Sequence, residues 1–333
     1  MKMTGVNRGI LKGLICATCV ILSMVMMAAG EPKMTTHVYK TVGDLEIKAD
    51  VYAYPDNLVR PLVVNIHGGA LIMGGRQSIN GRIRKMAFEN GYVLISLDYR
   101  LAPETQLPEI IKDIEDAFRW IRKEGPAKFH VDIERIAVCG GSAGGYLTLA
   151  SGYRVQPRPQ VLLSLWGYGD LIGDWYSQPS SYERHYRIKM SETEAWKQVS
   201  GKAIANSADR EGHGGAFYQF CRQKGLWPKA VSGWNPVNQA EKFFPFMPMK
   251  NVTSDFPPTF LIHGTQDTDV PHQQSVMMAR EFIIHRVEHR FLSISQGEHG
   301  LPGADPEQVE GAYKQAFEFI TRILGKVSLE NKP

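Results

Sequence analysis

Short apolar stretches alternate with longer amphipathic stretches along most of the chain. The short stretches are rich in Val, Ile and Leu, as buried β-strands are. The first two surround Gly43-Asp44 and predict an opening antiparallel pair. The strands expected in this way are His37–Val42, Leu45–Tyr54, Pro61–Ile66, Tyr92–Leu97, Arg135–Cys139, Gln160–Trp166, Pro258–His263 and Arg290–Ser295.

The longer stretches carry apolar residues at helical spacing. The clearest runs from Leu107 to Ile121, with Pro108 in its first turn and Gly125 after its expected end. Regular alternation of strands and helices is typical of a mostly parallel sheet covered on both faces. The expected fold class is therefore α/β, with eight strands. The other expected helices are Ile79–Asn90, a small-residue helix after Ser142, Gln273–His285 and Glu307–Leu324.

The alternation stops between about residues 170 and 255. This segment is rich in tryptophan, tyrosine and phenylalanine and is broken near its end by Pro245 and Pro248. A stretch of this length is unlike a plain loop. We expect an inserted cap over the carboxyl ends of the strands, where open α/β sheets bind ligands. Most of its aromatic residues should form its own small core.

The N-terminus has the pattern of a targeting segment. Lys2, Arg8 and Lys12 precede an uncharged apolar stretch that ends in small residues at 28–30. This order predicts a signal peptide over residues 1–30 and a secreted or periplasmic protein. The alternative is an uncleaved membrane anchor, since the stretch is close to spanning length.

Composition narrows the remaining choices for residues 31–333, which we expect to form one domain carrying the cap. The net charge of the 333-residue chain is +4, and residues 1–30 contribute three basic and no acidic residues, so the rest carries +1. No basic run suggests a nucleic-acid partner. Cys139 and Cys221 remain after processing; their spacing does not argue for a disulfide, although an oxidising compartment would permit one.

Gly140 to Gly144 reads G-x-S-x-G between an expected strand and an expected helix. This is the context of a nucleophile elbow, in which Ser142 sits in a cramped turn that tolerates only glycine two positions to either side. The free amide groups at the start of the following helix would stabilise negative charge.

A second glycine-rich loop, His67-Gly68-Gly69-Ala70, follows the strand Pro61–Ile66. Without large side chains, its amide groups can face the serine and form an oxyanion hole together with the amide of Ala143. His67 is expected to hold this loop rather than to take part in catalysis.

Two loops beyond the cap supply an acid and a base. Asp267 lies between a strand and a helix, and His299 follows the last expected strand. The order Ser142, Asp267, His299 is that of the α/β-hydrolases, with His299 taking the proton of Ser142 and Asp267 orienting the imidazole. Asp269 is the alternative acid.

The sequence His285-Arg286-Val287-Glu288-His289 matches a zinc-protease pattern, H-x-x-E-H. That pattern requires one continuous helix so that both histidines reach the metal. Here it spans a helix end and the entry to a strand, so we expect no metal site. Nothing in the chemistry outlined above requires a cofactor.

With these motifs in hand, the chain resembles the α/β-hydrolase superfamily, and within it the hormone-sensitive-lipase-type and related secreted bacterial esterases. The resemblance extends from about residue 37 onward and includes Asp98–Glu104, a structural link with no catalytic role carried over. It implies an oxyanion hole formed by the amide groups of Gly69, Ala70 and Ala143, with Gly68 shaping the loop.

Three departures weaken any transfer of substrate preference. Ala70 replaces the usual third glycine, Gly141 stands where an acidic residue is frequent, and the cap must come mainly from residues 170–255 rather than from an N-terminal helical segment. The expected function is a serine carboxylic-ester hydrolase for small or short-acyl esters, acetylated carbohydrate included. The alternatives are an amide or peptide hydrolase with the same triad and a non-catalytic binding protein on this scaffold.

Overall fold

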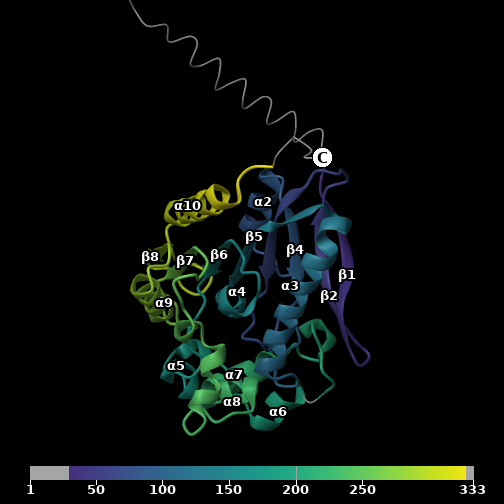
Figure 1. Ribbon diagram of the computed structural model, residues 1–333. Coiled ribbons are helices and arrows are strands. Elements are labelled where there is room, and N and C mark those ends of the chain that lie inside the picture. Colours follow the sequence, from purple (N-terminus) through teal and green to yellow (C-terminus); the bar gives the residue numbers. More distant parts are fainter. Residues whose placement is uncertain (1–29, 200, 328–333) are drawn as a thin grey trace, which may run out of the picture.

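The computed structural model describes residues 30–199 and 201–327, and these form an eight-stranded sheet in the order β1-β2-β4-β3-β5-β6-β7-β8 (Figure 1). The α/β-hydrolase architecture predicted from the sequence is confirmed. Its strands are β1 (Lys33–Val42), β2 (Leu45–Ala53), β3 (Arg60–Ile66), β4 (Val93–Leu97), β5 (Val131–Gly141), β6 (Val161–Leu165), β7 (Thr259–Gly264) and β8 (His289–Ile294).

Only β2 runs against its neighbours. It pairs antiparallel with β1 and with β4, whereas β3 to β8 are parallel. The central strands β3, β4, β6 and β7 are buried along their whole length, as expected for a sheet covered on both faces.

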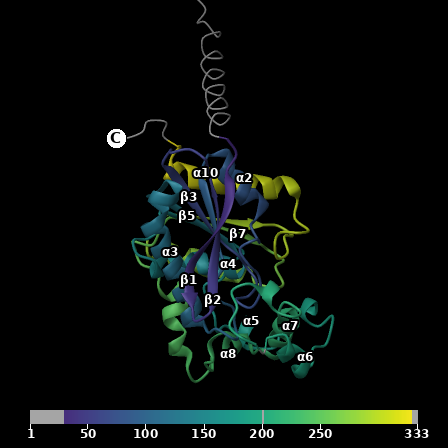
Figure 2. The same ribbon diagram turned by 90° about the vertical axis from the view of Figure 1, so that its right-hand side faces the viewer.

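Helices cover both faces of the sheet. The helices α3 (Leu107–Phe129), α4 (Ala143–Arg154) and α9 (Gln273–Ile284) share one apolar core with alternate sheet residues such as Val64. The helices α2 (Gly81–Glu89) and α10 (Pro306–Leu324) pack on the other face with residues such as Val63, and Figure 2 shows them on the side away from α3 and α4. Successive strand side chains point to opposite faces, so the two cores separate Val63 from Val64.

The expected end of α3 at Gly125 is wrong. The helix continues through Gly125 and Pro126 and ends at Phe129, and the amide of the next residue, His130, donates to the Gly125 carbonyl. Burial of Phe129 holds this last turn against the core, which offsets the hydrogen bond that proline cannot donate.

Short helices occupy the segment 170–255, which we call the cap. They gather at the end of the sheet where the parallel strands finish (Figure 1). Its elements are α5 (Asp174–Ser177), α6 (Glu192–Lys197), α7 (Gly215–Lys224), α8 (Trp227–Ser232) and the 3₁₀ turns η1 (Glu183–His185), η2 (Ser207–Asp209), η3 (Ala240–Lys242), η4 (Phe244–Phe246) and η5 (Pro248–Lys250).

The signal peptide or anchor predicted at the N-terminus lies outside the described residues, apart from residue 30. No helix in residues 30–199 and 201–327 has both the length and the apolar character needed to cross a bilayer.

Candidate active site

Ser142 occupies a strained turn between β5 and α4. Its backbone has φ 58° and ψ −124°, a conformation that costs a non-glycine residue about 1–3 kcal/mol. The Ser142 amide donates to the carbonyl of Leu165, 2.9 Å away. A Cβ atom on Gly144 would lie 2.1 Å from the Ile66 carbonyl oxygen, and one on Gly140 would lie 2.4 Å from that of Gly144. The glycine requirement predicted for this elbow therefore has a steric cause.

Residues 67–71, which we call the glycine loop, lie directly against this elbow. A Cβ atom on Gly68 would stand 2.8 Å from the carbonyl oxygen of Gly141 and 3.3 Å from Cβ of Ser142. Gly69, Ala70 and Leu71 all have positive φ, at 107°, 57° and 62°. Three successive residues with positive φ make a sharp turn next to the serine.

The three amide groups expected to form an oxyanion hole have no acceptor. Among the described residues, the N–H groups of Gly69, Ala70 and Ala143 donate to no other group. Ala143 is the first residue of α4, so its amide is one of the donors that a helix leaves unpaired. Ala70 adopts the left-handed conformation, so replacement of the usual glycine does not prevent the turn.

His67 makes two contacts at the start of the glycine loop. Its Nδ1 donates to the Gly68 carbonyl oxygen at 2.7 Å, and its ring stacks on Tyr99 at a centroid distance of 4.2 Å. Burial lowers the pKa of His67 to about 4, so the ring is neutral near pH 7. Its Nε2 has no partner among the described residues.

The cap supports the glycine loop from the other side. The indole Nε1 of Trp227, a fully buried residue at the start of α8, donates to the Ala70 carbonyl oxygen at 2.9 Å. The guanidinium of Arg210 contacts the carbonyls of Ile72 and Ala102 and pairs with Glu104. The cap thereby donates hydrogen bonds both to the glycine loop and to the residues that flank it.

The segment Asp98–Glu104 joins the same framework. Asp98 binds the guanidinium of Arg76 at 2.6 Å, and Arg100 makes two 2.8 Å contacts with the buried Asp113. These ion pairs brace the strand ends beside the site, in keeping with the structural link expected from the sequence.

Asp267 and His299 come together at the carboxyl ends of β7 and β8. The Nδ1 atom of His299 lies 2.8 Å from Oδ2 of Asp267. The other carboxylate oxygen accepts the amide protons of Asp269 and Val270, at 2.9 and 2.8 Å. His263 adds a contact from Nε2 to Asp267 Oδ2 at 3.2 Å.

This arrangement sets the ionisation of both groups. Burial acts to raise the pKa of Asp267, but the hydrogen bonds from His263 and His299 outweigh it and lower that pKa to about 2. Burial acts to lower the pKa of His299, whereas the Asp267 hydrogen bond and the Asp269 and Asp267 charges outweigh it and raise that pKa above its usual 6.5. A negative acid beside a basic imidazole is the state that a general base requires.

The loops that carry the acid and the base form one unit. A Cβ atom on Gly264 would lie 2.1 Å from the carbonyl oxygen of Gly297, and the amide of Gln266 donates to that same carbonyl at 2.9 Å. The carboxylate of Glu298 also binds the hydroxyl and amide of Thr268. These contacts fix the positions of the Asp267 and His299 loops relative to each other.

Ser142 is close to this unit but is not bonded to it. Among the described residues, no hydrogen bond joins its Oγ to His299. Trp166, the residue after β6, neighbours both loops: a Cβ atom on Gly141 would lie 3.1 Å from its indole Nε1, and its ring centroid lies 6.3 Å from that of His299.

Asp269, the alternative acid, does not contact Nδ1 of His299. Its Oδ2 atom lies 3.8 Å from the opposite ring nitrogen, Nε2. The two-residue offset from Asp267 therefore places the two carboxylates on different sides of the same imidazole.

The zinc-like pattern does not lie on one helix. His285 follows the last residue of α9, Arg286 has a positive φ of 57°, and His289 begins β8. The turn at Arg286 separates the two histidines, so they do not share a helical face.

Cys139 and Cys221 are both buried free thiols.

Several residues beside the site were not predicted from the sequence. They come from the cap or from the end of β6, and only their aromatic or charged character could have suggested them. They are Arg184, His185, Tyr218, Arg222, Trp227 and Trp166.

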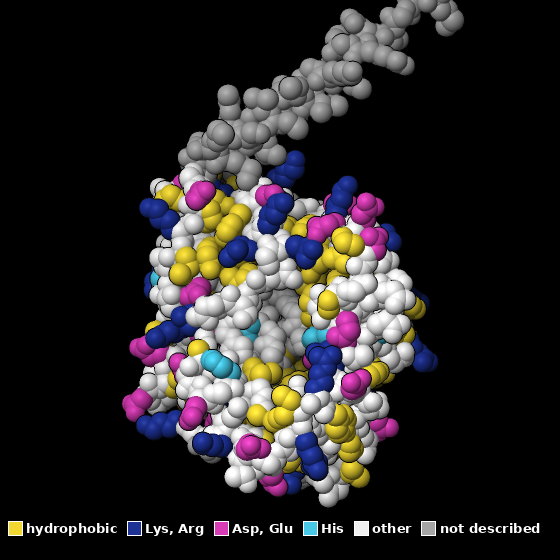
Figure 3. All heavy atoms as spheres, turned by 180° about the vertical axis from the view of Figure 1, so that it is seen from behind, with side chains coloured by type: hydrophobic (Ala, Val, Ile, Leu, Met, Phe, Trp, Pro, Cys, Tyr) yellow, Lys and Arg dark blue, Asp and Glu magenta, His cyan; other side chains and the backbone are white. Residues whose placement is uncertain are grey.

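The space-filling view in Figure 3 shows a hollow about half-way down one face of the molecule, with histidine side chains beside it.

A model of the alpha/beta hydrolase fold matches residues 63–302 of the chain, which includes every site residue described above. The chain belongs to the alpha/beta hydrolase family. The resemblance to hormone-sensitive-lipase-type members is confirmed.

Part of a much larger curated protein is similar to most of this chain. The non-reducing polyketide synthase Preu3 of Preussia isomera is 26% identical over 331 residues, covering 82% of this chain. This chain spans only 13% of the length of that relative, so the match concerns a small part of a larger enzyme.

Two solved structures share the fold. An alpha/beta hydrolase superfamily protein from Enterococcus faecalis is 21% identical, with a TM-score of 0.67 over 87% of this chain and 99% of its own. An acetyl ester-xyloside bifunctional hydrolase from Caldicellulosiruptor lactoaceticus is 19% identical, with a TM-score of 0.64 over 88% of this chain and 97% of its own.

Proposed function

We propose that this alpha/beta hydrolase is a serine carboxylic-ester hydrolase with Ser142 as nucleophile, His299 as base and Asp267 as orienting acid. The observation that carries the proposal is the Asp267–His299 pair, joined at 2.8 Å beside the strained elbow of Ser142. A nucleophile, a base and an orienting group are the three parts that a Ser-His-Asp mechanism requires, and this supports the proposal.

In the first half of the reaction, Ser142 Oγ attacks the ester carbonyl carbon while its proton passes to Nε2 of His299. The C=O electron pair moves onto oxygen, and the amide groups of Gly69, Ala70 and Ala143 stabilise that oxyanion. Asp267 stabilises the imidazolium through Nδ1. The C–O bond to the alcohol then breaks, and the alcohol leaves with the proton from Nε2.

In the second half, water attacks the acyl-enzyme. His299 takes a proton from the water, the oxyanion forms again in the same amide cluster, and collapse releases the carboxylic acid. The proton returns from His299 to Ser142 Oγ. The ester and one water are consumed, and the proton of Ser142 is restored, so the two half-reactions balance.

The proposed substrates are small or short-acyl esters. The proposal is supported by the short helices of the cap, which gather at the ends of the parallel strands and limit the room there. The acetyl ester-xyloside hydrolase among the solved structures makes acetylated carbohydrate one member of this class worth testing.

Turnover of p-nitrophenyl acetate by Ser142→Ala tests the proposal. We expect loss of at least a thousandfold in kcat, since the nucleophile is absent. Ser293→Ala is the matched control because Ser293 is an exposed serine of β8 whose hydroxyl is hydrogen-bonded to His272. Near wild-type turnover by Ser142→Ala would overturn the assignment.

Two further measurements separate the alternatives. A matched amide turned over as fast as the ester would favour an amide hydrolase. Failure of a fluorophosphonate probe to label Ser142 would favour a binding protein. A series of p-nitrophenyl esters from acetyl to octanoyl, together with acetylated xylose, defines the acyl and alcohol preference.

We further propose that the protein is exported, on the strength of the basic and apolar pattern in residues 1–30. Cell fractionation tests this. A signal peptide predicts a shortened soluble protein outside the cytoplasm, whereas an anchor predicts a full-length membrane protein.

A further inference from the structure

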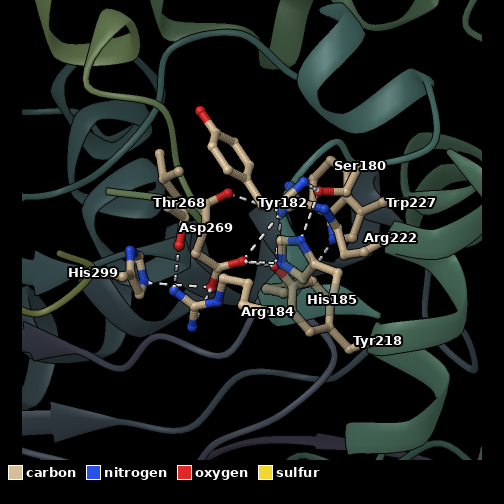
Figure 4. Close-up of polar contacts among 12 residues, drawn as sticks. Ser180, Tyr182, Arg184, His185, Tyr218, Arg222, Trp227, Thr268, Asp269 and His299 are labelled. Atoms are coloured by element: carbon tan, nitrogen blue, oxygen red, sulfur yellow. Dashed lines mark hydrogen bonds and ion pairs between the residues drawn. The ribbon is translucent and has the colours of Figure 1, made fainter. Parts of the chain in front are cut away.

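Asp269 is a buried carboxylate that the reaction described above does not use. Its exposed fraction is 8%. One oxygen, Oδ1, lies 2.6 Å from the hydroxyl of Tyr218, 3.0 Å from Nε2 of His185 and 3.2 Å from Nη1 of Arg222. All three partners belong to the cap, and Figure 4 shows them gathered around Asp269.

The other oxygen, Oδ2, points away from this cluster. It lies 3.8 Å from Nε2 of His299 and 3.8 Å from Nη2 of Arg184 (Figure 4). These distances exceed a hydrogen bond, so Oδ2 acts on both groups through its charge. Nε2 is the nitrogen that would exchange the proton of Ser142.

The hydrogen bonds around Asp269 keep it ionised and fixed. Burial acts to raise its pKa, but the His185 hydrogen bond and the charges of His299, Arg222 and Arg184 outweigh burial and hold the pKa well below its usual range. Arg222 also donates to the Asp269 backbone carbonyl at 2.9 Å. The position of this charge is therefore set by the cap.

We propose that Asp269 is a positioning residue that holds the imidazole of His299 from its Nε2 side and ties its alignment to the cap. This inference rests on the proposed function, in which His299 is the base. Asp267 fixes the ring through Nδ1, and Asp269 places a second negative charge where the proton arrives. His299 is thus held between two carboxylates.

The consequence is electrostatic. When Nε2 takes the proton of Ser142, the new positive charge forms 3.8 Å from Asp269 Oδ2. A carboxylate within about 4–6 Å favours the charged form of a base by roughly one unit of pKa or more. Asp269 therefore makes His299 a stronger base than Asp267 alone would.

Other charged groups around His299 act in both directions. Arg184, from η1 of the cap, opposes protonation of His299 and is itself paired with Glu298 at 2.7 Å. Asp267 favours protonation of His299, and His263 contacts that same carboxylate, with Nε2 3.2 Å from Asp267 Oδ2. Because Asp269 raises and Arg184 lowers the pKa of His299, removing each charge in turn should move that pKa in opposite directions.

The first experiment measures kcat/KM against pH for p-nitrophenyl acetate. Asp269→Asn keeps an oxygen for Tyr218 and His185 but removes the charge, so we expect the acid-limb pKa to fall by about one unit and the plateau rate to fall severalfold. Arg184→Gln, at a partly exposed position, should move that pKa upward. Asp255→Asn is the matched control, because Asp255 is an exposed carboxylate that precedes β7, at the opposite end of that strand from Asp267.

A second experiment reads the His299 ring without turnover. In the Ser142→Ala background, the Cε1–H signal of His299 is identified by its loss in His299→Gln and titrated by NMR. We expect the same downward shift for Asp269→Asn and the same upward shift for Arg184→Gln. A purely structural role would lower the melting temperature without moving this titration.

The two experiments also separate the inference from the proposed function. If the wild-type protein shows no Ser142-dependent turnover, the ester-hydrolase assignment fails, while the NMR titration still tests Asp269. If Ser142-dependent turnover is present and Asp269→Asn leaves the His299 pKa unchanged or raises it, the role of Asp269 is overturned.

Discussion

Replacing Trp227 with phenylalanine would remove the hydrogen bond by which the cap supports the glycine loop. The indole Nε1 donates to the Ala70 carbonyl oxygen at 2.9 Å, and the ring stacks on Tyr176 with centroids 3.8 Å apart. Phenylalanine keeps an aromatic ring in the stack but leaves that carbonyl without its donor. Because Trp227 is fully buried, water cannot readily take the place of the lost indole N–H.

The cost can be worked out from these contacts. A buried carbonyl left without its donor costs about 1–3 kcal/mol. The space left by the smaller ring adds about 1 kcal/mol. We therefore expect the free energy of unfolding to fall by about 2–4 kcal/mol, a large part of the roughly 5–15 kcal/mol typical of a domain.

The effect on rate follows from the adjoining amide. Complete loss of one oxyanion donor costs about a hundredfold to a thousandfold in kcat. In Trp227→Phe the amide N–H of Ala70 is still present. The next peptide group, which contains the Ala70 carbonyl, has lost its hydrogen bond, so the amide is held less firmly in place. We expect kcat to fall about tenfold, equivalent to about 1.4 kcal/mol, with KM nearly unchanged.

Thermal unfolding and kcat for p-nitrophenyl acetate check both expectations. Trp234→Phe is the matched control, since Trp234 packs in the same cap against Phe243 and Phe246 away from the glycine loop. That variant should lose some stability and keep its kcat. A Trp227→Phe protein with wild-type kcat would refute the argument that the cap positions the loop.

Three further outcomes are expected. Asp267→Asn should lower kcat by roughly ten-thousandfold while the protein stays folded, because His299 loses the acceptor that fixes its tautomer; kinetics and circular dichroism check this, and a loss below tenfold would contradict it. The pKa of His67 is about 4 in the folded protein and 6.5 in the unfolded chain, so the unfolded chain binds the proton more readily. The free energy of unfolding should therefore be at its full value above pH 6.5 and should fall by about 3 kcal/mol as the pH drops toward 4. Urea unfolding of wild type and His67→Phe across this range measures it, and equal slopes in both proteins would count against it. Gly144→Ala should fail to fold, since its Cβ would meet the Ile66 backbone, whereas Gly81→Ala, with open space, should fold normally; soluble yield and Tm distinguish the two, and a stable Gly144→Ala protein would show that the elbow can relax.

Much of the fold was predictable because it depends on local patterns. Buried strands appear as β-branched runs, and the elbow needs glycine at fixed positions, so both leave a signature that a single sequence shows. The end of α3 was missed because glycine at 125 and proline at 126 are local stop signals, while burial of Phe129 is a tertiary effect.

The cap contacts could not be predicted for a similar reason. Asp269 meets Tyr218 and Arg222 across about fifty residues of sequence, and Trp227 reaches back more than a hundred and fifty residues to Ala70. Such pairs depend on how irregular segments pack, which no periodicity reveals. The identity of Asp267 as the partner of Nδ1 was predicted, whereas the position of Asp269 on the other side of the ring was not.

The cap is attached both to the glycine loop with its flanking residues and to Asp269, and this bears on how the protein could be re-engineered. Exchanging residues 170–255 for the cap of a relative looks like a change of specificity alone. However, Trp227 and Arg210 would leave with it, and so would the residues that surround Asp269. A chimera without equivalent hydrogen-bond donors at those points would gain a new pocket but lose support for the glycine loop and for Asp269. Grafted caps should therefore be chosen for these contacts first and screened for substrate range afterwards.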